Sequence, residues 1–193
     1  MNDMGQESRL LYQAVKALEG HYQSGGEIVQ CVIHHATAAA TAAALEGVLP
    51  GAGSAIAAAT STGIIITMYV SLGKKLNVRL GHGTLKALAS ALVADLAGAF
   101  AANLAGAAIL SFIPGLGSLG SAAITGLTSF AYVYLAGLIY IKMVAAILES
   151  GKSMNDLSEE ELIKMAKKTT STVNLKKAMN EIKSAYKSRK NCE

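Results

Sequence analysis

The chain has 193 residues, of which 52% are hydrophobic and 16% charged, with no tryptophan and a net charge of +4. The charges are unevenly distributed: Glu46 is the only one within 28–73, Asp95 is the only one within 87–141, and ten Lys or Arg follow Glu149. A helix that is apolar on all sides has to be buried in protein or in lipid. Because a chain of this size has little mass to cover several such helices, the composition indicates a membrane protein.

Other classes are excluded by what the sequence lacks. Two cysteines, Cys31 and Cys192, lie far apart and form no disulfide framework. The polar first residues do not resemble a signal peptide. The basic residues lack interleaved aromatics and any known binding motif, so we expect no nucleic-acid partner.

Apolar periodicity and breaker residues predict an all-α chain. An amphipathic helix is expected at 6–23, followed by four long apolar helices at 27–48, 54–76, 84–112 and 118–148. A capping box from Ser158 to Glu161 then opens a charged helix, and 174–188 form a basic amphipathic helix. We therefore divide the chain into an N-terminal helix and linker (1–26), an apolar membrane domain (27–150) and a basic helical tail (151–193).

Two Pro-Gly-x-Gly-Ser turns, sixty-four residues apart, centre two helical hairpins and indicate an internal duplication. Proline stops the incoming helix, glycine permits unusual backbone angles, and serine can cap the outgoing helix. The turn residues are Pro50, Gly51, Gly53, Ser54, Pro114, Gly115, Gly117 and Ser118. A glycine-rich phosphate loop is rejected, because no strand precedes either turn and the Lys-Ser or Lys-Thr pair is missing.

Counting from the prolines supports four membrane crossings. A bilayer core of about 30 Å corresponds to about twenty helical residues. Tyr69 lies nineteen residues after Pro50, Tyr132 and Tyr134 lie eighteen and twenty after Pro114, and Asp95 lies nineteen before it. We therefore expect these side chains at a membrane interface. The alanine-rich first apolar helix leaves re-entrant hairpins as an alternative.

The basic residues predict the orientation. A cationic loop and the basic tail share one side if there are four crossings, which places both termini in the cytoplasm. These bases are expected to contact anionic lipid or a partner protein. They are Lys74, Lys75, Arg79, Lys176, Lys177, Lys183 and Lys187.

Small residues recur at every fourth position in the last two apolar helices, which lets helices approach closely in lipid. One stripe consists of Ala94, Gly98, Ala102 and Gly106, and the other of Gly117, Ser121, Thr125 and Ser129. We expect them to pack the hairpin, or alternatively to form a homo-oligomer.

Candidate chemistry is sparse. Cys31, His34 and His35 resemble zinc ligands, but no second ligand pair accompanies them. We instead place both histidines at the interface, and hypothesise a contact with Asp95 in the other hairpin. No catalytic triad or carboxylate pair is present in the sequence pattern, so we expect neither enzyme activity nor a cofactor.

The span 36–148 resembles the hydrophobic helical domain found with bacterial small GTPases, the YcjF-like family. Ile113-Pro-Gly-Leu-Gly-Ser118 and the following helix, with Gly126, Thr128, Tyr132 and Gly137, match its second proline element. Leu49-Pro-Gly-Ala-Gly-Ser54 matches the first one loosely and lacks its usual acidic residue. The resemblance implies a membrane-associated helical domain acting beside a separate GTPase.

The sequence thus predicts a non-enzymatic, oligomeric integral membrane protein, acting as a scaffold or as the membrane arm of a GTPase-linked system. Two alternatives stay open: a pore-forming or membrane-inserting effector, and a soluble Ala-rich interaction module. Dye leakage from liposomes would distinguish the pore, and homogeneity without detergent would distinguish the soluble module.

Overall fold

The computed structural model describes residues 8–18, 25–46, 53–103 and 121–190, and within these ranges the chain is helical without strands. The all-α prediction is confirmed, and most helix ends lie within a few residues of those expected. The elements are α2 (Arg9–Lys16), α3 (Gly25–Glu46), α4 (Gly53–Lys75), α5 (His82–Asn103), α7 (Ser121–Glu149), the 3-10 turn η2 (Met154–Asp156), α8 (Glu159–Thr172) and α9 (Leu175–Lys190).

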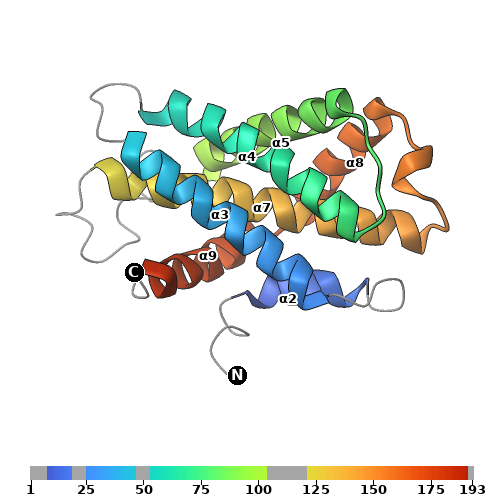
Figure 1. Ribbon diagram of the computed structural model, residues 1–193, viewed down its shortest axis with the longest axis horizontal. Helices are drawn as coiled ribbons and strands as arrows, with labels where there is room; N and C mark the ends of the chain where they lie inside the picture. Colours follow the sequence, from blue (N-terminus) through green and yellow to red (C-terminus); the bar gives the residue numbers. More distant parts are fainter. Residues whose placement is uncertain (1–7, 19–24, 47–52, 104–120, 191–193) are drawn as a thin grey trace.

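Helix α7 forms the centre of the bundle. It contacts every other described helix, and all residues from 129 to 141 are buried. Figure 1 shows α4 and α5 along one side of α7, and α2 and α9 along the other. A helix that is apolar around its whole circumference has to be enclosed by protein or by lipid, and in this structure the other helices enclose it.

Helices α3 and α7 approach closely at two glycines. A Cβ at Gly137 would lie 2.6 Å from Val32 Cγ1, and a Cβ at Gly126 would lie 3.1 Å from the Ala40 carbonyl oxygen. Since Gly126 precedes Gly137 whereas Ala40 follows Val32, the two helices run antiparallel. The small side chains of the alanine run in α3 therefore allow α7 to pack closely against it.

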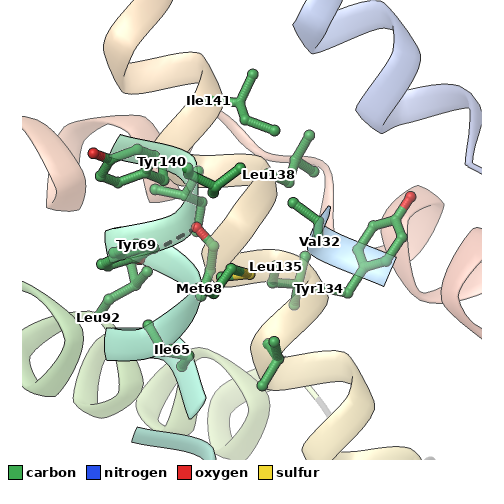
Figure 2. Close-up of a cluster of buried hydrophobic side chains, with 14 of the residues drawn as sticks. Val32, Ile65, Met68, Tyr69, Leu92, Tyr134, Leu135, Leu138, Tyr140 and Ile141 are labelled. Atoms are coloured by element: carbon green, nitrogen blue, oxygen red, sulfur yellow. Dashed lines mark hydrogen bonds between the residues drawn. The ribbon is translucent and has the colours of Figure 1, made fainter. Parts of the chain in front are cut away.

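Two stacked tyrosines join α4 to α7 (Figure 2). The rings of Tyr69 and Tyr140 lie 4.5 Å apart at an interplanar angle of 22°. The Tyr69 hydroxyl donates a hydrogen bond of 3.3 Å to the Ala136 carbonyl oxygen. Burying a phenol requires such a partner, because an unpaired buried hydroxyl is costly.

Glu181 of α9 joins the two ends of the described chain to α7. Its Oε2 atom accepts hydrogen bonds from the Leu10 amide at 2.8 Å and from the Tyr134 hydroxyl at 3.3 Å. Leu10 is in the first turn of α2, where backbone amides lack helical partners and favour a negative charge. Residues from all three predicted segments of the chain therefore share one core.

The capping box that was predicted to begin α8 is confirmed. The Ser158 hydroxyl accepts from the Glu161 amide, and the Glu161 carboxylate accepts from the Ser158 amide. Helix α4 begins at Gly53, one residue before the expected cap, Ser54. The rest of both predicted turns, Pro50, Gly51, Pro114, Gly115, Gly117 and Ser118, lies outside the described residues.

The four predicted membrane crossings are not supported. Within the described part of the chain, only Thr125–Glu149 of α7 is long and apolar enough to cross a bilayer, with a mean hydropathy of 1.9 over its most apolar stretch. That stretch is 83% buried inside the protein.

Candidate functional site

A cleft of about 360 Å³ lies at the turn between α4 and α5. The last turns of α4, the connecting loop 76–81 and the first turn of α5 form its walls, and Tyr140 of α7 contributes from the core. Its lining residues are Val70, Gly73, Lys74, Asn77, Val78, Arg79, Leu80, Leu85 and Tyr140.

Three local features shape the loop. The Val78 amide donates to the Gly73 carbonyl oxygen at 2.8 Å, and a Cβ at position 73 would lie 2.7 Å from the Val78 carbonyl oxygen. Asn77 has a φ of 48°, a left-handed conformation that asparagine tolerates better than most residues. The Arg79 amide donates to Asn155 Oδ1 at 2.7 Å, which fixes the loop to the η2 turn.

The cleft is positively charged. Lys74 and Arg79 are exposed at its lining, and no salt bridge to either one is found among the described side chains. The neighbouring Lys75 is instead 2.7 Å from Glu27 of α3. The hydrogen bond between them lowers the pKa of Glu27 and raises that of Lys75. Two cations therefore stand beside apolar walls without a countercharge from the described chain.

The tyrosines that we predicted at a membrane interface lie inside the protein. Tyr69 and Tyr134 are 1% and 0% exposed, and Tyr132 is 9% exposed. Tyr69 packs against Tyr140, and Tyr134 bonds to Glu181. The partners of Tyr69 and Tyr134 are therefore other protein groups and not lipid headgroups.

The structure does not bring the histidines and Asp95 together. His34 is exposed, and His35 Nδ1 lies 2.8 Å from the Cys31 carbonyl oxygen in its own helix. No hydrogen bond or ion pair joins either ring to Asp95 in the described structure. Helices α3 and α5 both pack against α4 and α7, and neither packs extensively against the other.

The small-residue stripe of α5 faces outward where the structure describes it. Ala94 and Gly98 are exposed, and nothing lies within 4 Å of a Cβ added at Gly98. The side chain of Ala102, and Gly106 as a whole, lie outside the described residues. Close helix approach occurs instead at Gly126 and Gly137, two positions that the sequence marks only through the family resemblance.

The basic tail lies along the bundle. The rings of Tyr186 on α9 and Phe130 on α7 meet edge to face, with their centroids 5.6 Å apart. Further toward the start of α9, Glu181 accepts a hydrogen bond from the Tyr134 hydroxyl. Helix α9 therefore runs antiparallel to α7, beside its first half. Lys176, Lys177 and Lys187 are exposed. Lys183 is half-buried, and burial, together with Lys187, lowers its pKa.

The described residues contain no group of three His, Cys, Asp or Glu side chains that could hold a metal ion. Burial raises the pKa of the Cys31 thiol, which disfavours the thiolate that metal binding requires.

No protein-family model, curated protein or solved structure matches this chain. The resemblance to the helical domain of bacterial GTPase systems therefore depends on the sequence motifs alone and stays a prediction.

Proposed function

We propose that the protein is a non-enzymatic membrane-inserting module, which folds around α7 and releases that helix into an anionic bilayer. The observation that carries the proposal is the enclosure of α7. This helix has the length and hydropathy of a membrane span, yet 83% of its apolar stretch is covered by the other helices.

The composition of the outer surface is evidence that the bundle faces water before insertion. Among the described residues, Tyr12 and Val70 are the only large hydrophobic side chains that are substantially exposed. The exposed positions of α5 are small or polar instead, such as Ser90, Ala94 and Gly98. A lipid-facing surface would present large apolar side chains, and here these point inward.

The position of α9 supports an opening step. Lys183 and Lys187 lie on a helix that packs beside the part of α7 between Gly126 and Tyr134. If α7 crossed a bilayer with this packing intact, both amines would lie at the depth of the hydrocarbon, where a charge is costly. Insertion therefore has to separate α7 from α9.

A disulfide between α3 and α7 tests the proposal. Cβ atoms at positions 32 and 137 lie 3.2 Å apart, so a small shift reaches the 3.5–4.5 Å of a disulfide. We would combine V32C and G137C with C31A and C192A. The readout is retention on phosphatidylglycerol-containing vesicles after an alkaline carbonate wash.

We expect the reduced protein to stay with the vesicles and the oxidised protein to be removed by the wash, with retention differing by about tenfold or more. The single variants V32C and G137C, treated with the same oxidant, control for oxidation itself. Equal retention of the oxidised and reduced proteins would show that α7 need not leave α3. Absence of retention in both states would favour a soluble interaction module.

A homo-oligomer and a separate GTPase stay predicted partners, and a cytoplasmic orientation of both ends stays a predicted topology. If each chain inserts one apolar helix, several inserted copies can associate through α7, which is how a homo-oligomer would form in the membrane. Cross-linking of the carbonate-resistant fraction would measure that association.

A further inference from the structure

We propose that the cleft between α4 and α5 binds the phosphate group of an acidic phospholipid, with Lys74 and Arg79 on the phosphate and the apolar walls on the start of an acyl chain. This inference rests on the proposed membrane function, since it names the lipid chemistry that the folded bundle would recognise before α7 is released.

The two cations supply the recognition of charge. Lys74 and Arg79 line the same cleft, and no described carboxylate forms a salt bridge with either. The adjacent Lys75, by contrast, is paired with Glu27 at 2.7 Å. Arginine and lysine both bind phosphate oxygens, and arginine can do so through two parallel hydrogen bonds.

The apolar walls supply the recognition of a hydrocarbon tail. Val70, Val78, Leu80 and Leu85 line the cleft together with the cations, and Val70 is one of two large hydrophobic side chains that are substantially exposed among those described. A free inorganic anion would leave these walls in water. An amphiphile would cover them while its phosphate stays at the charged lining.

Size and position fit this occupant. A volume of about 360 Å³ is at the lower end of the range for small-molecule sites, about 300–1,000 Å³. It suits a headgroup phosphate with a short length of chain. Tyr140 of α7 lies at the floor of the cleft, where it is 0% exposed, and stacks on Tyr69, so a bound lipid would lie next to the helix that is proposed to insert.

The experiment uses short-chain probes that stay in solution. Isothermal titration calorimetry of the full chain would compare dioctanoyl phosphatidic acid, dioctanoyl phosphatidylcholine and inorganic phosphate, each lipid below its micelle concentration. We expect phosphatidic acid to bind at least about tenfold more tightly than either of the others, since only it combines a tail with an unshielded phosphate. Equal affinity for inorganic phosphate would show a simple anion site and overturn the lipid assignment.

Two variants test the residues. K74Q/R79Q should weaken phosphatidic acid binding by about tenfold or more, and V70W, which fills the cleft from an exposed position, should do the same without a change of charge. K167Q/K168Q on α8 is the matched control, because it removes the same charge from two exposed lysines outside the cleft. If this control weakens binding as much as K74Q/R79Q, the effect is one of net charge and the site is refuted.

The oxidised V32C/G137C protein separates this inference from the proposed function. Its cleft is intact while α7 is held against α3, so phosphatidic acid should bind it as it binds the reduced protein. Failure of the reduced protein to insert into vesicles, with normal phosphatidic acid binding in both states, would refute the membrane-inserting function alone. Insertion without any cleft binding would refute the lipid site alone.

Discussion

Helices α5 and α7 are both long and almost free of charge, yet they occupy opposite positions in the molecule. Between Phe130 and Ile141 every residue of α7 is buried, whereas α5 presents Ser90, Ala94 and Gly98 to the outside. Scarcity of charge therefore does not separate a helix that needs covering from one that can face water. The volume of the side chains separates them, because small residues expose little apolar area to water.

The strongest test of this comparison places the same charge on both helices. A136E puts a carboxylate at a position of α7 that is 0% exposed, where burying an unpaired ion costs several kcal/mol. We expect it to abolish the folded state, as measured by circular dichroism and urea denaturation. A94E on α5 should change the free energy of unfolding by no more than about 0.5 kcal/mol.

If A94E unfolds the protein as well, the outer face of α5 is covered in the native state. Dissociation of an oligomer by A94E, seen by light scattering without loss of helicity, would identify that cover as a second copy of the chain.

A smaller effect is expected from adding one methyl group to each helix. G137A forces a Cβ to within 2.6 Å of Val32 Cγ1, and such overpacking typically costs about 1–3 kcal/mol. G98A adds a methyl group where nothing lies within 4 Å, so it should raise stability by about 0.5–1 kcal/mol through helix propensity. Denaturant midpoints measure both.

The double variant V32A/G137A supplies the control, because it removes the two Cγ atoms that the new Cβ would meet. Its destabilisation should be smaller than the sum of V32A and G137A. Additive effects would show that Val32 and Gly137 are not in contact.

The smallest effect concerns pH. Burial raises the pKa of Tyr69 well above its usual value, and Tyr140 adds to the shift. The unfolded chain loses the Tyr69 proton near pH 10 while the folded protein keeps it, so stability present below pH 10 is lost as the pH rises. This residue should contribute a slope of about 1.4 kcal/mol per pH unit.

Urea denaturation of the parent and Y69F between pH 9.5 and about 11 measures that slope. Y69F should be less stable at neutral pH, by about 1 kcal/mol for the hydrogen bond to Ala136, and should show the shallower decline. Identical slopes would place the Tyr69 phenol in water, as the interfacial prediction required.

Local features of the fold could be predicted from the sequence. Periodicity located the helices, and Ser158 with Glu161 predicted the start of α8, because a capping box depends on four consecutive residues. Which helices pack against each other could not be predicted in this way. Which helices become neighbours depends on which small residues face each other. Ala94 and Gly98 are four positions apart, and this spacing is the same whether the two residues face another helix or solvent.

The cleft was predicted in part. Lys74 and Arg79 were identified as a cationic loop, since they interrupt a long uncharged stretch. Their apolar companions and Tyr140 could not be identified, because the contact between residue 140 and the 73–80 segment follows from how α4 packs on α7. The tyrosines were predicted at a membrane interface because their distances from the prolines along the chain are nearly equal, but helices buried in a protein core can carry tyrosines at the same spacing.

The carboxylate of Glu181 has a consequence for the order of events on the ribosome. It accepts a hydrogen bond from the Leu10 amide across 171 positions of sequence, so this one contact of the segment at 8–18 forms only after almost the whole chain has been made. Helix α7 is translated well before α9, and it leaves the exit tunnel without that cover. During this interval, a nascent chain near a bilayer has its most apolar helix available to the membrane, and a chaperone that binds apolar segments would compete for the same helix.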